Sequence, residues 1–238
     1  MLKLVIFLLI TPFVLCSQKI AGTKLVIHIE HKVDSQYLQL DSITYKNNIG
    51  QPYMITKFKY YLSNIILKSK DKKKSISHDV FLIDEENTSS KEIILSKIKK
   101  GVYDSISFII GVDSLRNCSG AQSGALDPIN TMFWTWNTGY IFLKLEGKST
   151  MSSAPGKIFE YHIGGYKEPT NAIEKVHLAL PFPLDFTKVN EQTIKVNVNV
   201  AELFRAPMDI DFSKLPSVTD TKNALVISRN YKDMFSIK

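Results

Sequence analysis

The segment with the most chemical potential runs from Met132 to Tyr140 and reads Met-Phe-Trp-Thr-Trp-Asn-Thr-Gly-Tyr. It holds both tryptophans of the chain, Trp134 and Trp136, two residues apart. On a strand, Met132 and the two tryptophans share one face, because successive side chains alternate. A thioether beside indoles is a soft, oxidisable environment, and soft ligands favour Cu(I). A row of core side chains is the alternative interpretation, because such residues are mostly buried.

Five histidines supply the nitrogen ligands that a metal site would need: His28, His31, His78, His162 and His177. His162 is the best single candidate, because it ends a strand-like run and a Gly-Gly pair follows at residues 164–165. A structural histidine is the alternative there. His31 is a further candidate ligand, although His28 and His31 face opposite sides of a strand and a joint chelate needs a bend. Zinc and copper signatures such as Cys-x-x-Cys and His-Glu-x-x-His are absent.

Three acids near the tryptophan segment, Asp113, Asp127 and Glu146, offer oxygen ligands. They make calcium a second candidate ion, but no Asp-x-Asp-x-Asp-Gly loop accompanies them. The alternative is that they cap turns, above all Asp127 before Pro128. Neither a Gly-x-Ser-x-Gly elbow nor a phosphate-binding loop occurs. We therefore predict that the protein is not an enzyme.

Short strands must position these side chains. Apolar residues recur with a period of two in eight runs separated by Gly, Pro, Asn and Ser clusters. The runs are Lys24–Glu30, Phe58–Leu67, His78–Ile83, Ser105–Ile110, Tyr140–Glu146, Ile158–His162, Lys175–Leu180 and Ile194–Val200. In the last run, Val196, Val198 and Val200 share one face. This pattern predicts an all-β fold, an antiparallel β-sandwich-like single domain with long loops.

Little of the chain suits helices. Ser89–Lys99 fits one short helical turn or an irregular strand, and Ala201–Arg205 fits a helical turn after the last strand. Thr221–Phe235 carries Leu225, Ile227, Tyr231 and Phe235, which predicts a short C-terminal helical segment docked on the sheet. The longest irregular region is Asp113–Thr131. A loop of that length inside a compact domain is usually functional or disordered.

The N-terminus resembles a secretory signal. Lys3 precedes an apolar run from Leu4 to Leu15, which is too short to span a bilayer. We predict a cleaved signal peptide at residues 1–17, a single domain at residues 18–238, and a periplasmic or secreted protein without a transmembrane anchor. A lipidated Cys16 is the alternative, although Leu15 stands where a small residue is expected. If Cys16 leaves with the signal peptide, Cys118 is the one cysteine of the mature chain, and we expect no internal disulfide.

The charge balance is modestly basic. The 238 residues carry 30 Lys and Arg against 23 Asp and Glu, a net charge of +7. Much of the excess lies in Lys68–Lys74, which resembles a solvated hairpin tip, and in Lys97–Lys100. Nucleic-acid binding needs a basic face and a recognition motif, and no such motif occurs. At 44% hydrophobic residues, the chain is long enough to bury a sizeable core without disulfides.

Six stretches, taken in order, resemble the MbnP family of periplasmic copper-binding proteins. They are Tyr60-Tyr-Leu-Ser-Asn64, Ile110-Gly-Val-Asp113, Gly124-Ala-Leu-Asp-Pro128, Met132-Phe-Trp-Thr-Trp-Asn-Thr-Gly-Tyr140, Lys144-Leu-Glu-Gly147 and Tyr161-His-Ile-Gly-Gly165. The Met-x-Trp-x-Trp-x-x-Gly-Tyr pattern is the most specific of them. The resemblance extends over nearly the whole mature chain. One departure is that the cysteine found after the matching histidine in better-known members is missing here.

The resemblance implies a β-sandwich-like domain outside the cytoplasm that binds copper as Cu(I) or Cu(II). In members of known role, a partner di-haem enzyme of the MbnH type oxidises a tryptophan to kynurenine, and the modified residue lies at the copper site. The matching positions are Met132, Trp134, Trp136 and His162, with Trp134 and Trp136 as candidates for the modification. The alternative is a non-enzymatic extracytoplasmic module that binds a partner without metal.

Overall fold

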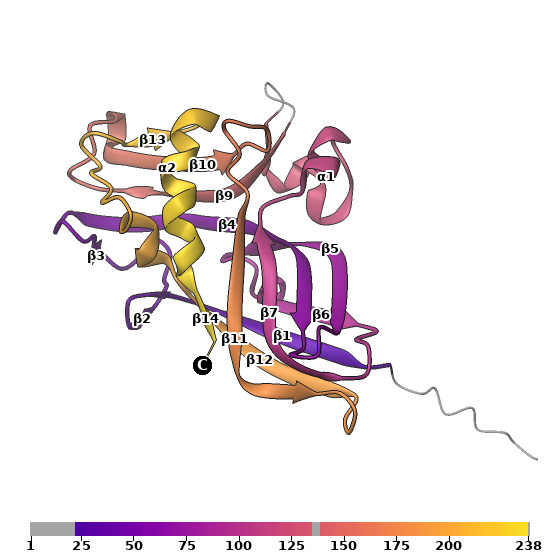
Figure 1. The fold of residues 1–238 in the computed structure, drawn as a ribbon. Coiled ribbons are helices and arrows are strands. Elements are labelled where there is room, and N and C mark those ends of the chain that lie inside the picture. Colours follow the sequence, from indigo (N-terminus) through magenta and orange to yellow (C-terminus); the bar gives the residue numbers. More distant parts are fainter. Residues whose placement is uncertain (1–21, 135–138, 238) are drawn as a thin grey trace, which may run out of the picture.

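The computed structural model describes residues 22–134 and 139–237, so the predicted signal peptide at residues 1–17 lies outside the described part. Two β-sheets pack against each other (Figure 1). The five-stranded sheet contains β1 (Lys24–Val33), β2 (Gln36–Tyr37), β6 (Glu92–Ser96), β12 (Glu191–Asn199) and β14 (Phe235–Ile237). The nine-stranded sheet contains β3 (Tyr45–Lys46), β4 (Pro52–Lys68), β5 (Lys74–Asp84), β7 (Val102–Ile110), β8 (Phe133–Trp134), β9 (Gly139–Lys148), β10 (Ile158–Gly164), β11 (Glu174–Asp185) and β13 (Ser217–Val218).

The predicted sandwich of strands is confirmed, and the sheets are mixed. Most neighbouring strands run antiparallel, but β1 pairs with β12 in parallel, and β10 pairs with β13 in parallel. Both parallel pairs join segments that lie far apart in the sequence, and alternation within one strand carries no information on such partners. The centre of the nine-stranded sheet follows the order β7-β4-β9-β10.

Strand β4 is longer than the run Phe58–Leu67 that its alternation predicts. Through Tyr60 it pairs with β9, and from Leu62 onwards it pairs with β7. Within the stretch that pairs with β7, the register shifts just after Ser63, at Asn64, whose φ of 51° is left-handed. A bulge of this kind leaves one residue out of the ladder and bends the strand.

Aromatic side chains fill the space between the sheets. Phe235 on β14 packs edge-on against Phe108 on β7, with ring centroids 5.0 Å apart, and also contacts Tyr60 on β4. A second group contains Tyr53, Phe159, Phe204 and Phe212. These rings are buried, and burial of large aromatic surfaces is a main source of folding free energy.

The helices are few and mostly short. The α-helices are α1 (Ser114–Cys118) and α2 (Thr221–Tyr231), and the 3₁₀ turns are η1 (Thr88–Lys91), η2 (Gly124–Leu126), η3 (Pro128–Asn130), η4 (Pro155–Lys157), η5 (Val200–Phe204) and η6 (Lys232–Met234). Helix α2, drawn in yellow in Figure 1, confirms the predicted C-terminal helical segment and packs against β10 and η5. The predicted turn after the last strand is η5, and residues 88–96 contain both a helical turn and a strand.

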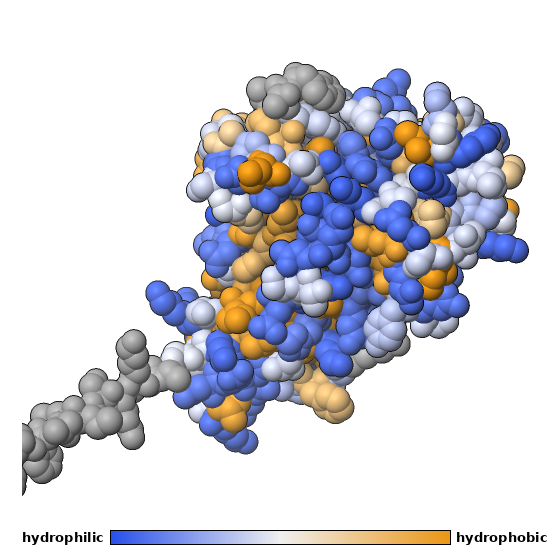
Figure 2. Space-filling view, turned by 180° about the vertical axis from the view of Figure 1, so that it is seen from behind, coloured by the Kyte–Doolittle hydropathy of each residue, from blue (hydrophilic) through white to orange (hydrophobic). Residues whose placement is uncertain are grey.

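The surface is predominantly polar. The run from Lys68 to Lys74 is the tip of the β4–β5 hairpin, as predicted, and most of its residues are exposed. Figure 2 shows hydrophilic residues over most of one face, with smaller hydrophobic areas between them. Within the described residues, no helix is long and apolar enough to cross a membrane.

Candidate functional site

The two described ends of the tryptophan segment pair with each other. Strand β8 pairs antiparallel with β9, so that Phe133 faces Tyr140 and Trp134 faces Gly139. The backbone N–H of Ile141 also donates to the Met132 carbonyl oxygen at 2.9 Å. Phe133–Trp134 and Gly139–Tyr140 therefore belong to two antiparallel strands, whereas the spacing predicted one row of side chains on a single strand. Residues 135–138, which include the candidate Trp136, lie outside the described part of the chain.

Trp134 extends from β8 across β9 and reaches β10. Its partner Gly139 has no side chain, which leaves room for the indole above the strand. The ring then lies against Gly164 on β10, where an added β-carbon would come within 2.7 Å of Cζ3. The residue is 6% exposed. Two glycines on adjacent strands therefore shape the place that Trp134 occupies.

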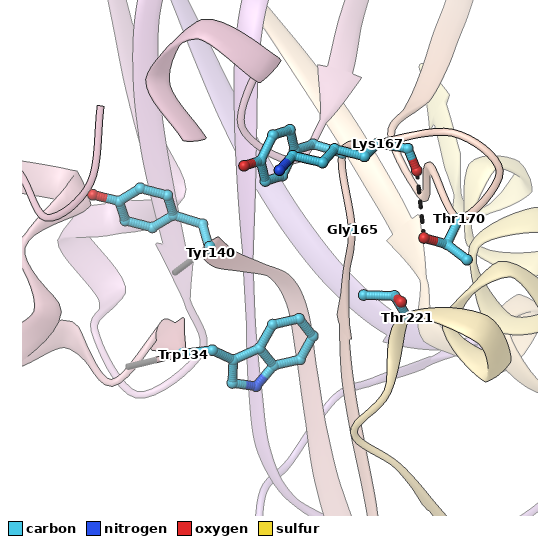
Figure 3. A pocket seen from close by; sticks show the side chains of 8 residues that line it. Trp134, Tyr140, Gly165, Lys167, Thr170 and Thr221 are labelled. Atoms are coloured by element: carbon cyan, nitrogen blue, oxygen red, sulfur yellow. Dashed lines mark hydrogen bonds between the residues drawn. The ribbon is translucent and has the colours of Figure 1, made fainter. Parts of the chain in front are cut away.

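A small pocket opens beside this indole. Its volume is about 190 Å³, and Tyr140, Lys167, Thr170 and Thr221 are among the residues that line it. Figure 3 shows Trp134 and Tyr140 on one side of the pocket and Thr170 and Thr221 on the other. The Thr170 hydroxyl donates to the Lys167 carbonyl oxygen at 3.3 Å, which steadies the wall formed by that loop.

His162 lies on the same strand as Gly164, two residues earlier. Strands rise by about 3.3 Å per residue, which places the histidine roughly 6.6 Å along the backbone from the glycine that supports Trp134. Its Nε2 is 2.8 Å from Oε1 of Glu146 on β9. This hydrogen bond holds the pKa of the Glu146 carboxyl below its usual value, although partial burial opposes the shift. Within the described residues, no hydrogen bond engages Nδ1 of His162.

Met132 belongs to the same neighbourhood through its backbone. Its carbonyl oxygen accepts the hydrogen bond from the Ile141 N–H, and Ile141 faces Gly164 in the ladder between β9 and β10. Met132 is fully buried. Met132 and Trp134 therefore come from the β8 segment on one side of β9, and His162 comes from β10 on the other side. The structure brings these three predicted site residues to one end of the nine-stranded sheet.

A sequence model of the MbnP family matches residues 22–221. The chain belongs to the MbnP family. The fold agrees with that of MbnP from Methylosinus trichosporium, with a TM-score of 0.60 over 92% of this chain and 99% of the solved one. The two sequences are 11% identical, so this likeness concerns the fold alone. No curated protein sequence matches the chain.

In this MbnP-family chain, His31 lies elsewhere. Its buried ring joins the two sheets, with Nδ1 2.5 Å from Oε2 of Glu85 and Nε2 2.8 Å from the Tyr60 hydroxyl. Burial lowers the pKa of His31, and Glu85 raises it less. Tyr60 points between the sheets, whereas the neighbouring Lys59 lies in register with Lys144 and His162 on the other face. The structure thus does not bring His31 to Trp134 or His162.

The acids that suggested calcium have other partners. The Asp113 side chain caps α1 by accepting from the Arg116 N–H and forms an ion pair with the Arg116 guanidinium. Asp127 caps η3 by accepting from the Ile129 N–H at 2.9 Å. The Glu146 carboxylate accepts a hydrogen bond from Nε2 of His162. Within residues 22–134 and 139–237, no group of three or more His, Cys, Asp or Glu side chains is arranged to hold a metal ion.

Lys144 also belongs to this region, although the sequence pattern did not single it out as a site residue. Lys144, on β9, is buried and donates from Nζ to the Thr131 carbonyl oxygen at 2.5 Å. Burial lowers the pKa of Lys144, Lys57 and Lys59 lower it further, and Glu146 opposes the shift. Its signal in the sequence is a lysine in the middle of an otherwise apolar run, Tyr-Ile-Phe-Leu-Lys-Leu.

Exposed Cys118 in α1 has no disulfide partner within the described residues.

Proposed function

We propose that this protein binds copper outside the cytoplasm, at the end of the nine-stranded sheet where Met132, Trp134 and His162 lie. The observation that carries the proposal is the state of the His162 imidazole. Its Nε2 is held by a carboxylate, while Nδ1 has no hydrogen-bond partner in the described part of the chain. In metal sites, a histidine that ligates the metal through one ring nitrogen commonly donates the N–H of the other nitrogen to a carboxylate. This hydrogen bond fixes the ring and raises the basicity of the ligating nitrogen.

The donor set fits copper better than calcium. An imidazole and a thioether are nitrogen and sulfur donors of the kind that bind copper, and Cu(I) in particular. Calcium requires six to eight oxygen ligands, and Asp113 and Asp127 are already used as helix caps. We therefore assign His162 and Met132 as candidate ligands for Cu(I), with Cu(II) as the oxidised state. Trp136 remains a further candidate from outside the described residues.

The proposal includes the oxidation of one tryptophan to kynurenine by a partner di-haem protein of the MbnH type. Trp134 lines a pocket that opens to the surface, so a partner has a route to its indole. Oxidising equivalents from the di-haem partner would cleave the indole C2–C3 bond to give N-formylkynurenine, and hydrolysis would release the C2 carbon as formate. The aryl ketone and the aniline that remain would add polar groups near His162. Family membership supports this modification, and so does the Met-x-Trp-x-Trp pattern.

The test combines mass spectrometry and metal competition. Protein from its native host is expected to show a mass increase in the one peptide that contains Trp134 or Trp136, and to retain Cu(I) against a competing chelator. His162→Ala and Met132→Ala are expected to lose that Cu(I). His78→Ala is the matched control, because His78 is exposed on β5. Unmodified tryptophans together with no Cu(I) retention would exclude the proposal.

The second candidate is a binding module for an extracytoplasmic partner without metal. The pocket beside Trp134 favours it, because two tyrosines, the indole and Lys167 line a hollow of about 190 Å³. Binding of a small ligand there requires the pocket walls and leaves His162 uninvolved. His162→Ala that keeps ligand binding, together with a Thr221→Trp variant that fills the pocket and abolishes it, would favour this second function.

A further inference from the structure

Lys144 is a buried cation in a place where an apolar residue would fit. It is 7% exposed, and lysine is almost never this buried unless it is paired. Its ammonium has three donors, and the Thr131 carbonyl is the hydrogen-bond acceptor that the described residues give it, at 2.5 Å. Removing an ammonium from water costs free energy that a leucine would not. The contact with Thr131 therefore needs a reason beyond packing.

The neighbours of Lys144 connect it to His162. The two residues face each other directly in the ladder between β9 and β10. Side chains so placed have β-carbons about 4.5–5.5 Å apart. Glu146, two residues further along β9, accepts a hydrogen bond from His162 and lies on the same face of the strand as Lys144. The candidate ligand, its carboxylate partner and the buried cation therefore lie close together on two paired strands.

The other end of the contact lies at the start of the tryptophan arm, which we define as residues 131–134. Thr131 closes η3 in a left-handed conformation, with φ of 60°, and is followed directly by Met132. Its carbonyl, held by Lys144, marks the point where the chain turns from the 113–131 loop into β8. Beyond that point, the arm is joined to β9 by the short β8 ladder and by the bond from Ile141 to Met132.

We propose that Lys144 is a positioning residue that holds the tryptophan arm on β9, so that Met132 and Trp134 stay beside His162. This inference rests on the proposed copper function. Lys144 does not bind the metal. It determines where the arm begins, through its hydrogen bond to the Thr131 carbonyl.

Two roles for the ammonium predict opposite results when it is removed. A positive charge near a bound copper ion repels it, so replacing Lys144 by a neutral residue strengthens copper binding if the charge alone matters. If Lys144 positions the arm, the same replacement weakens copper binding, because the donors on the arm and on β10 are no longer held together. The sign of the change therefore separates the two roles.

The experiment compares Lys144→Leu with Lys144→Arg and with Lys148→Leu. Leucine removes the hydrogen-bond donor without adding a metal ligand, and arginine keeps charge and donors. Lys148 is the matched control, because it is exposed near the end of the same strand. Hydrogen exchange of the Ile141 amide in metal-free protein reports on the arm, since this amide donates to Met132. Competition with a chelator then measures Cu(I) affinity.

We expect Lys144→Leu to speed exchange at Ile141 and to weaken Cu(I) binding about tenfold or more, the scale seen when a residue that orients a ligand is lost. Lys144→Arg keeps most of the wild-type behaviour in both measurements, and Lys148→Leu changes neither. Unchanged exchange, or Cu(I) binding that is equal or tighter in Lys144→Leu, overturns the inference. Failure of the wild-type protein to bind Cu(I) overturns the proposed function instead, and exchange at Ile141 still decides whether Lys144 holds the arm. If Lys144→Leu does not fold, Lys144→Gln takes its place.

Discussion

Gly164 on β10 and Trp134 on β8 are complementary in shape, because the indole occupies the space where any larger residue at position 164 would place its β-carbon. That β-carbon would come within 2.7 Å of the indole and 2.6 Å of the Tyr140 carbonyl oxygen. The second contact is with backbone, which cannot swing away as a flexible side chain can. The position of Trp134 therefore depends on a glycine that is 30 residues away in the sequence.

Gly164→Ala is expected to displace Trp134 and to lower the free energy of unfolding by about 1–3 kcal/mol, the usual cost of inserting a methyl group into a packed core. Chemical denaturation measures the change, and tryptophan fluorescence in a Trp136→Phe background reports on Trp134 alone. Gly22→Ala is the control, because nothing lies within 4 Å of a β-carbon there. Equal stability and fluorescence in both variants would contradict the close packing.

Glu146→Leu is expected to weaken Cu(I) binding about 10- to 100-fold, if His162 is a ligand, because the carboxylate that holds Nε2 is lost. Glu146→Gln is expected to have a smaller effect, since an amide oxygen still accepts the hydrogen bond. Glu160→Gln serves as the control, because Glu160 faces Glu146 across the ladder but holds no histidine. Competition with a chelator gives the affinities. Identical values for all three variants would remove His162 from the ligand set.

Alternation in the sequence was sufficient to predict the strands and the sandwich, because a half-buried strand must alternate whatever its partners are. It could not predict partners. His31 looked like a candidate ligand, yet it is bonded to Tyr60 and Glu85, which lie 29 and 54 positions away. The burial of His31 follows from the packing of β1 against β4, and no local pattern encodes that contact.

At the candidate site too, the sequence predicted the residues but not the partners of the strands that carry them. Met132, Trp134 and His162 were predicted from residue type and from a family pattern, and the fold brings them to the two segments that flank β9. The antiparallel pairing of β8 with β9 could not be predicted, since Met, Trp and Trp at alternate positions resemble one strand. Lys144 was missed as well, because a single lysine in an apolar run does not reveal that Thr131 is its acceptor.

His31 predicts a dependence of stability on pH. Burial lowers its pKa below the usual histidine value of 6.5 in the folded protein, so near that pH the unfolded chain binds more protons than the folded one. The free energy of unfolding therefore rises with pH through this range and falls as the pH decreases below about 6.5. The lowered pKa of Glu85 acts in the same direction, but only at pH values near and below its usual value of 4.5.

Urea denaturation between about pH 5 and pH 8 isolates the part due to His31. We expect His31→Gln to flatten the curve, because glutamine can bond to Tyr60 and Glu85 without titrating. His78→Gln, at an exposed site, is expected to keep the wild-type slope. A His31→Gln curve as steep as that of the wild type would assign the pH dependence to other groups.

Asp220 controls the start of helix α2 and, through Thr221, one wall of the pocket beside Trp134. Its side chain accepts hydrogen bonds from the backbone N–H groups of Lys222 at 3.0 Å and Asn223 at 2.9 Å. It also accepts a hydrogen bond from the side-chain amide of Asn223. These donors have no acceptor within the first turn of a helix, so the cap satisfies groups that would otherwise depend on water. The burial of the carboxylate is slight, and these bonds lower its pKa.

Asp220→Ala is expected to lower the free energy of unfolding by about 1 kcal/mol, the usual effect of losing an aspartate cap. Asp71→Ala in the exposed β4–β5 hairpin tip is the control, and it is expected to be nearly neutral. Hydrogen exchange should rise at the amides of residues 222 and 223 and leave the amides of β9 unchanged, because fraying begins at the uncapped turn and the sheet does not depend on it. Exchange that increases equally in α2 and β9 would mean that Asp220 supports the whole domain and not the helix terminus.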